Sequence, residues 1–200
     1  MSGRDAILSE LSEARYDSPP LPELSGFGGE YEDPIAQFES SLETVGGSLI
    51  RVARSVDLAD ALADLEVVRQ AERLYSSLPA AVAGNVALSE IADPKELNNL
   101  GLAIVRGEWA VAENGAVWVN PTDLRHRAVL FIAEHLVLVV SESKLVHNMH
   151  QAYERLGANL PGYGLFISGP SKTADIEQSL VIGAQGPRSL HVCLVAGSDE

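Results

Sequence analysis

Apolar residues along the chain fall into two patterns, short runs of mostly apolar residues and stretches in which apolar residues recur every three or four positions. The short runs predict strands at residues 48–52, 102–105, 116–119, 136–140, 164–167 and 190–195. The run at 136–140 is unbroken, which is typical of a strand covered on both faces of a sheet. The helical spacing predicts helices at 34–42, at 55–77 and from Ser141 or Ser143 to Leu156. Strands alternating with helices predict an α/β domain with a mainly parallel sheet.

The N-terminal part of the chain has a different pattern. Residues 4–15 carry three apolar side chains at helical spacing and predict a short helix. The stretch that follows is punctuated by proline and glycine, which opposes regular structure. Asp33-Pro34 then suits the cap and first position of the first domain helix. We therefore expect an N-terminal helix and Pro/Gly-rich arm at residues 1–33, and one α/β domain at residues 34–200.

The charge balance narrows the classes of partner. The 200 residues include 14 Lys and Arg against 28 Asp and Glu, a formal net charge of −14. Such a surface repels a phosphate backbone, so nucleic-acid binding is not expected, although a local site for a small anion remains open. The longest apolar run, at 128–140, is interrupted by Glu134-His135 and is too short to cross a bilayer. With no apolar signal core near Met1, we expect a cytoplasmic protein.

The metal-binding side chains are few. Cys193 is the one cysteine, so this chain alone cannot hold an iron–sulfur cluster, and its apolar surroundings suggest a buried thiol. His147 and His150 stand three apart on the expected helix, but no clear further ligand completes a set, and a solvated helix face explains them as well. We predict no metal site, and no familiar cofactor motif is present.

The segment from Phe166 to Glu177 is the first candidate for ligand binding. It runs from a strand through a turn into a polar stretch that could begin a helix, where free backbone N–H groups attract anions. Hydroxyl groups, a turn and one cation follow one another here, at Ser168, Gly169, Pro170, Ser171, Lys172 and Thr173. The alternative is a simple connection in which Ser171 caps a helix and Lys172 is solvated. Asp175 and Glu177 would share a side only in an extended segment, so one is expected to organise the loop and the other to face ligand or solvent.

Two further segments could contribute to the same cleft. Glu113 stands before Asn114-Gly115, a strong turn signal, and could act as a base, a nucleophile or a hydrogen-bond acceptor. An ordinary glutamate in a hairpin turn is the alternative. Gly186-Pro187 precedes the last strand, where glycine permits close approach to a ligand and Arg188 could clamp an anion. A plain loop is the simpler interpretation of that segment.

At these positions the chain resembles the LUD domain of the LutC/YkgG family of lactate utilisation proteins. The resemblance rests on residues 168–177 with Leu180-Val181-Ile182-Gly183 and Gly186-Pro187, on Ala112-Glu113-Asn114-Gly115, and on His135-Leu136. It covers roughly residues 100 to 197. Asn114 stands where the family usually has Thr, and Gln185 where it commonly has His, so a proton-transfer role for that His is absent here.

The resemblance implies a three-layer α/β/α fold with a mainly parallel sheet, similar to the NagB/RpiA/CoA-transferase-like group. It also implies a subunit of an L-lactate oxidation system that works beside iron–sulfur partner proteins. Our leading hypothesis is a small anionic ligand bound at the carboxyl edge of the sheet, with Glu113 in any acid–base role. Two alternatives are a non-catalytic assembly or regulatory protein for those partners, and a stand-alone transferase or isomerase of the same fold.

Overall fold

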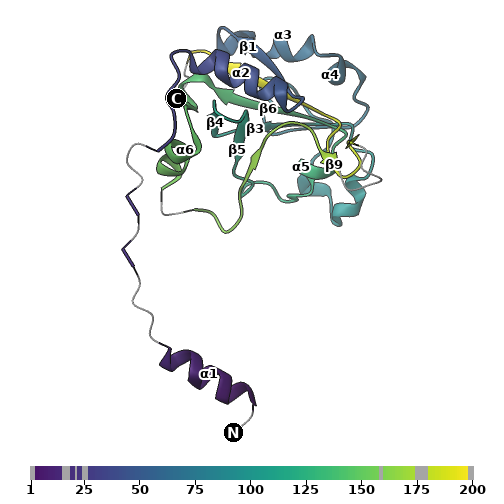
Figure 1. Cartoon of the computed structure of the whole chain (residues 1–200). Helices are drawn as coiled ribbons and strands as arrows, with labels where there is room; N and C mark the ends of the chain where they lie inside the picture. The colour runs from purple at the N-terminus through teal and green to yellow at the C-terminus, as the bar shows by residue number, and fades with distance from the viewer. Residues whose placement is uncertain are drawn as a thin grey trace.

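The computed structural model describes residues 3–14, 19–20, 22–23, 27–157, 160–173 and 180–197 (Figure 1). Its centre is a five-stranded sheet in the order β1-β11-β6-β3-β2, and every neighbouring pair is parallel. The strands are β1 (Ser48–Val52), β2 (Leu74–Ser76), β3 (Leu102–Arg106), β6 (His135–Ser141) and β11 (Ser189–Val195). The predicted α/β architecture with a mainly parallel sheet is confirmed.

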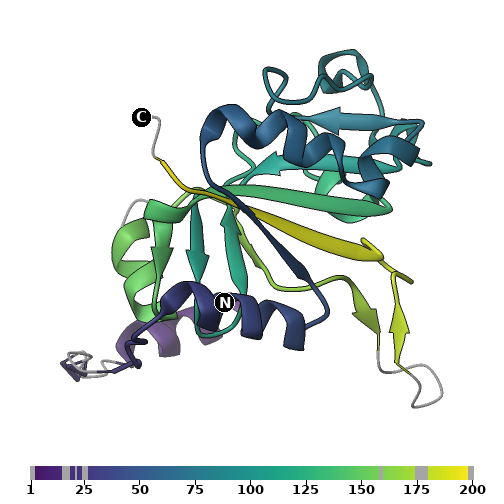
Figure 2. The same ribbon diagram turned by 90° about the horizontal axis from the view of Figure 1, so that it is seen from above.

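One face of this sheet is covered by two short helices, α3 (Leu58–Ala63) and α4 (Glu66–Gln70) (Figure 2). Leu62 of α3 packs into a buried cluster with Val137 of β6 and Cys193 of β11. Successive side chains of a strand point to opposite faces. Val137 and Cys193 therefore point to this face of the sheet, and the even-numbered residues beside them point to the other. The apolar strand runs therefore serve two cores at once.

The opposite face is covered by helices and by a second sheet. Helices α2 (Pro34–Thr44) and α5 (Val129–Ile132) pack there together with four strands in the order β7-β4-β5-β8. These strands are β4 (Trp109–Val111), β5 (Ala116–Val119), β7 (Leu145–Val146) and β8 (Leu165–Ile167). Strand β8 runs antiparallel to β5. Two strands expected from the sequence, β5 and β8, thus lie outside the parallel sheet.

The prediction of a single helix at residues 55–77 is wrong. The segment forms a 3-10 turn, η1 (Ser55–Asp57), then α3, α4 and the edge strand β2. Leu65 adopts an extended conformation and separates the two helices, and β2 pairs with β3 through Leu74 and Leu102. Long-range strand pairing at the sheet edge therefore overrides the helical spacing of the apolar residues.

The helix expected from Ser141 or Ser143 begins later than predicted. A 3-10 turn, η4 (Glu142–Lys144), and strand β7 come first, because Val146 pairs with Val111 of β4. Helix α6 (Met149–Leu156) then starts after Asn148, whose side chain accepts a hydrogen bond from the backbone N–H of Gln151. Its end at Gly157, which has φ +65°, agrees with the sequence prediction.

The remaining elements are one helix near the N-terminus and four short 3-10 turns or strands. They are α1 (Gly3–Glu13), η2 (Leu88–Glu90), η3 (Pro94–Leu97), β9 (Lys172–Thr173) and β10 (Val181–Ile182). Strands β9 and β10 form a small antiparallel hairpin, so β9 replaces the helical start expected after Ser171. The predicted helix near the N-terminus is present as α1, which has no buried residue and lies apart from the rest of the chain in Figure 1. Asp33 caps α2 as expected, accepting from the N–H groups of Ile35 and Ala36.

Candidate functional site

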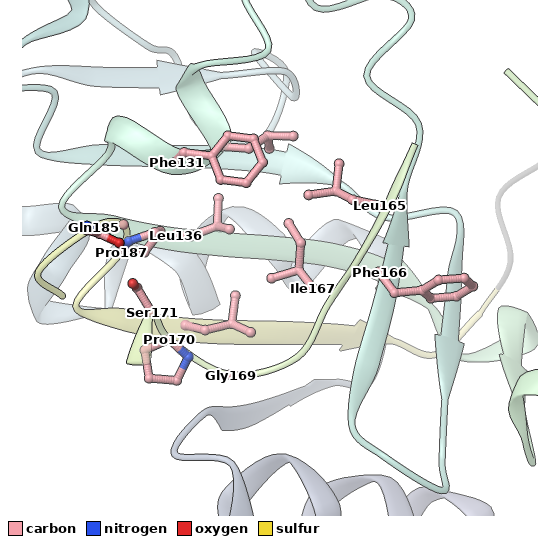
Figure 3. Close-up of a pocket in the computed structure, with 13 residues that line it drawn as sticks. Phe131, Leu136, Leu165, Phe166, Ile167, Gly169, Pro170, Ser171, Gln185 and Pro187 are labelled. Carbon is pink, nitrogen blue, oxygen red and sulfur yellow. The ribbon is translucent and has the colours of Figure 1, made fainter. Parts of the chain in front are cut away.

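A cavity of about 230 Å³ opens between α5, the strand β8 with the loop that follows it, and the loop that precedes β11 (Figure 3). Most of its wall is aliphatic or aromatic. The lining residues are Leu130, Phe131, Leu136, Leu165, Phe166, Ile167, Gly169, Pro170, Ser171, Gln185, Gly186, Pro187 and Leu190. Its volume is below the roughly 300–1,000 Å³ of pockets that enclose drug-sized ligands, which suits a small metabolite.

The polar groups of the cavity are sparse. Among the described lining residues none carries a charge, and Ser171 and Gln185 supply the side-chain polar groups. Figure 3 shows the hydroxyl of Ser171 directed toward the cavity, whereas the ring of Phe166 turns away from it. That ring instead packs in a tilted arrangement against Trp118, with the ring centroids 4.8 Å apart. A ligand in this cavity would meet apolar surface on most sides and neutral hydrogen-bonding groups at one end.

The cavity lies at the amino ends of β6 and β11, because Leu136 and Leu190 are the second residues of those strands. The expectation of a cleft at the carboxyl edge of the sheet is therefore corrected. The physical reason is the connection after β8. Ser171 donates its backbone N–H to the carbonyl of Pro187 at 2.8 Å and accepts at its own carbonyl from Gly183 at 2.9 Å. These bonds hold the loop against the chain that enters β11.

Two glycines allow this close packing. Gly169 has φ +75°, and a Cβ there would lie 2.3 Å from the carbonyl oxygen of Val45. At Gly186 a Cβ would lie 2.9 Å from the Cβ of Ser171. Glycine is needed at both positions because the backbone meets another segment of the fold, which accounts for its presence before any ligand is considered.

The segment after β8 also meets the turn at Asn114-Gly115, through a hydrogen bond from Ser168. Ser168 donates its hydroxyl to the backbone carbonyl of Asn114 at 2.7 Å. The side chain of Asn114 accepts from the N–H of Ala116 at 3.1 Å and shapes the turn. Gly115 has φ +66°, and a Cβ there would lie 2.7 Å from backbone atoms of Leu42. These residues join the second sheet to α2.

Glu113 and Lys172 lie away from the described lining of the cavity. The Glu113 carboxylate accepts from the N–H of Met149 at 3.2 Å, so it satisfies the first turn of α6. The Lys172 ammonium donates to the carbonyl of Val45, which is the C-cap of α2. A cation there complements the partial negative charge of a helix C-terminus. Thr173 pairs with Val181 in the β9–β10 hairpin, and Asp175 and Glu177 lie outside the described residues.

The structure also brings together polar residues that the sequence analysis did not assign. At the amino ends of three parallel strands, Ser48, His135, Ser189 and His191 are joined by hydrogen bonds. Burial lowers the pKa of both imidazoles, and the neighbouring His135 lowers the pKa of His191 further. The two-residue spacing of Ser189 and His191 at a strand start was the available signal, since it places both on one face.

The one thiol is buried, and two further histidines make contacts that hold segments of the fold together. Burial raises the pKa of the Cys193 thiol to about 12, so it stays protonated at neutral pH. The Nδ1 atom of His147 accepts from the N–H of Tyr31 at 2.9 Å, which ties the arm to the start of α6. The ring of His150 lies 6.1 Å from that of Phe27. Within the described part of the chain, no group of three or more His, Cys, Asp or Glu side chains is arranged to hold a metal ion.

Comparison with known proteins gives a consistent result. A model of the LUD domain family matches residues 92–195. Lactate utilization protein C 1 of Bacillus mycoides (strain KBAB4) is 36% identical over 92 residues, which cover 43% of this chain and 39% of that protein. Lactate utilization protein C of Shouchella clausii (strain KSM-K16) is 31% identical over 121 residues, or 58% of this chain and 48% of that protein.

Two further matches extend the comparison. The uncharacterized protein YkgG of Escherichia coli (strain K12) is 30% identical over 129 residues, covering 62% of this chain and 55% of that protein. The chain thus spans about half the length of the curated relatives it matches. A crystal structure of a DUF162 family protein from Deinococcus radiodurans superposes with a TM-score of 0.63 at 22% identity, over 82% of this chain and 96% of that one. This last likeness concerns the fold alone.

Proposed function

The chain belongs to the LUD domain family, and we propose that it acts in lactate utilisation by binding a small metabolite in the cavity beside α5. The observation that carries this proposal is positional. All the described lining residues fall within residues 92–195, the part of the chain that matches the family. Two relatives that are 36% and 31% identical to this chain over the matched residues are named for lactate utilisation. The cavity is therefore the feature through which the family's role would be exercised.

The walls of the cavity suggest how a small hydroxy or keto acid would sit in it. Its apolar end would contact Leu136, Leu165 and Leu190, while its polar end would face Ser171 and Gln185. A carboxylate needs hydrogen bonds when it leaves water, because burial of an unpaired charge is costly. The Ser171 hydroxyl would supply one. We therefore propose that the ligand is a small anionic metabolite and that neutral hydrogen-bond donors hold it.

The oxidation of L-lactate to pyruvate releases two electrons, and no side chain among the described residues of this chain is suited to accept them. Its one cysteine is buried and its thiol pKa is raised, so it is poorly suited to redox chemistry. We therefore propose that iron–sulfur partner proteins accept the electrons and that this chain contributes binding or orientation of the metabolite. Among the described residues, no helix has the length and apolar character needed to cross a membrane.

Growth on L-lactate as the sole carbon source tests the role. A strain that lacks this protein and any second lactate oxidase should fail to grow, and the wild-type gene should restore growth. Leu165→Trp fills the cavity and should not restore growth, whereas Leu160→Trp, at an exposed residue outside the lining, should. Normal growth of the deletion strain would remove the role in lactate utilisation. Equal growth of the two variants would show that lactate utilisation does not need the cavity.

A direct binding measurement addresses the ligand. A compound that binds only the folded protein raises its thermal stability, so lactate, pyruvate, nucleotides and coenzyme A can be compared by thermal shift. We expect lactate or pyruvate to raise the melting temperature of the wild-type chain and of Leu160→Trp. The same compounds should leave Leu165→Trp unshifted. A shift that persists in Leu165→Trp would place the ligand elsewhere.

One observation favours a second function, assembly of the partner proteins. Helix α1 exposes Ile7, Leu8 and Leu11, with 60%, 49% and 65% of their surface accessible. An exposed apolar stripe on a helix is typical of a segment that docks into a partner groove. We propose iron–sulfur lactate utilisation proteins as that partner. Ile7→Ser with Leu11→Ser should abolish their co-purification with this chain and leave thermal shifts by metabolites unchanged, and retained co-purification would contradict it.

A further inference from the structure

A continuous hydrogen-bonded chain crosses the amino ends of β1, β11 and β6. The Ser48 hydroxyl lies 2.6 Å from Nδ1 of His191, and Nε2 of the same ring lies 3.2 Å from the hydroxyl of Ser189. That hydroxyl is in turn 2.7 Å from Nδ1 of His135. The strand register produces the arrangement, because Ser48 is paired with His191 and Ser189 with His135. All four residues are partly buried.

The hydrogen-bonded series of side chains ends at an ion pair. Nε2 of His135 lies 4.0 Å from Oε1 of Glu134, and the same oxygen is 2.6 Å from Nη1 of Arg188. A single carboxylate oxygen thus stands between a guanidinium and an imidazole. The Glu134 and Arg188 side chains are 48% and 64% exposed, so the glutamate can swing into solvent without opening the core.

The hydrogen-bond directions along the chain depend on one another. Ser189 has one hydroxyl proton and lies between two imidazole nitrogens, so it donates to one and accepts from the other. The Glu134 carboxylate favours a proton on Nε2 of His135, which leaves Nδ1 as the acceptor of the Ser189 proton. Ser189 then accepts from Nε2 of His191, whose Nδ1 accepts from Ser48. Burial lowers the pKa of both histidines, which supports the neutral rings that this order requires.

We propose that this edge of the sheet is an acid–base site for small carboxylates, with His135 as the group that exchanges a proton with the ligand. The carboxylate of the ligand takes the place of Glu134 on Arg188, where the glutamate already shows that a carboxylate oxygen fits. Arg188 binds it as a charge-assisted hydrogen-bond donor. His135 then lies beside the functional group next to that carboxylate.

The proton balance closes through the remaining residues. When Nε2 of His135 gives its proton to the ligand, Nδ1 takes the hydroxyl proton of Ser189. Ser189 takes the Nε2 proton of His191, Nδ1 of His191 takes the hydroxyl proton of Ser48, and solvent reprotonates Ser48. One proton has moved from solvent to ligand, no residue has changed charge, and every hydrogen bond has reversed direction. The reverse sequence removes a proton from the ligand.

This site is distinct from the cavity. Alternation along β6 turns Leu136 toward the cavity and His135 toward the opposite face, and Leu190 separates Ser189 from His191 in the same way. The proposal therefore goes beyond the function proposed above and does not depend on it. Growth of the Leu165→Trp strain tests the cavity, whereas nuclear magnetic resonance of the histidines tests the site at the amino ends of the strands.

Nuclear magnetic resonance of the histidine side chains in the full ¹⁵N-labelled chain tests the ligand. Acetate and L-lactate, added at constant ionic strength, should shift the His135 ring signals in a saturable way. Glu134→Gln removes the competing carboxylate and should tighten binding several-fold, and Arg188→Gln should abolish the saturable shift. Arg127→Gln, which alters a cation stacked on Tyr163, is the matched control and should bind as the wild type does. If the His135 ring signals of Arg188→Gln shifted as much as those of the wild type, the proposed carboxylate site would be wrong.

The ring nitrogen signals also test the proton chain. In the wild type both rings should carry their proton on Nε2 above pH 7, and protonation of one histidine should lower the pKa of the other. Ser189→Ala should leave the charge repulsion between the two rings in place but release their fixed Nε2 tautomers, and Ser189→Thr should restore those tautomers. Unchanged tautomers in Ser189→Ala would show that the hydrogen-bonded series of side chains does not conduct a proton. Circular dichroism establishes that each variant is folded.

Discussion

The same short stretches of chain supply both the cavity and the histidine chain, yet the two regions differ completely in chemistry. Leu136 and Leu190 turn toward the cavity, whereas His135, Ser189 and His191 turn toward the other face. A period of two residues separates apolar packing from hydrogen bonding within a few residues of sequence. The comparison teaches that one strand end can carry an apolar cavity wall and a hydrogen-bonded series of polar side chains without mixing the two.

The largest expected effect is on the cavity face. Leu136 is 1% exposed and packs in the larger core cluster, so Leu136→Ala should lower the free energy of unfolding by about 2–5 kcal/mol. Urea unfolding followed by circular dichroism measures the change. A loss below about 1 kcal/mol would show that the wall of the cavity collapses around the missing side chain, and that the cavity is not held open by the fold.

The loop that closes the cavity should be nearly as sensitive. Gly169→Ala introduces a Cβ at positive φ against the carbonyl oxygen of Val45, so we expect a loss of about 1–3 kcal/mol in unfolding free energy. Gly29→Ala is the matched control, because a Cβ there meets nothing within 4 Å. If both variants unfold at the same urea concentration, the loop does not depend on its contact with α2.

The histidine chain should contribute less to stability. Ser189→Ala leaves two imidazole nitrogens without their shared partner at a partly buried site, and we expect a loss of about 1 kcal/mol. Because the folded state lowers the pKa of His135 and His191, the unfolded chain binds protons more readily at acidic pH. Stability should therefore fall as the pH drops below the ordinary histidine value.

The pH dependence separates the two regions. The loss of stability on acidification should be weaker in the double variant His135→Gln with His191→Gln, whereas Leu136→Ala should lower stability by a similar amount across the range. Melting temperatures between pH 5 and pH 8, near the ordinary histidine pKa, give the comparison. An unaltered pH profile in the double variant would mean that other groups govern the acid sensitivity.

The smallest effect is expected at Lys172. Its ammonium complements the C-terminus of α2, so Lys172→Ala should cost about 0.3–1 kcal/mol. Lys172→Arg keeps the charge and serves as the control. If Lys172 contacts the ligand, Lys172→Ala should also diminish the thermal shift given by lactate or pyruvate. An unchanged shift would limit this residue to its structural contact with Val45.

Several local features followed from the sequence because they depend on neighbouring residues. Asp33-Pro34 begins α2, and Gly157 ends α6, since capping and positive φ are local requirements. The unbroken apolar run at 136–140 gives the central strand β6, because only a strand buried on both faces excludes polar residues throughout. The α/β class and the mainly parallel sheet follow from the order of these elements.

Local spacing did not determine how the strands are distributed. The apolar pattern of β8 is that of a buried strand, but its pairing with β5 places it in the second sheet. That pairing brings the loop at residues 168–171 to the amino ends of the parallel strands and produces the cavity there. Lys172 and Glu113, which the sequence proposed as ligand groups, contact the ends of α2 and α6 instead of the cavity lining.

By itself the sequence determined four of the five strands of the parallel sheet, the start of α2, the end of α6, the net negative charge and the class of fold, because propensity, backbone conformation and charge are properties of short segments. Only the tertiary structure decided which strands share a sheet, where the cavity opens and that two histidines from different strands share one serine hydroxyl. Those features depend on hydrogen bonds between residues that lie up to 143 positions apart. Local patterns carry no record of such a register, which is selected by the free energy of packing the whole core.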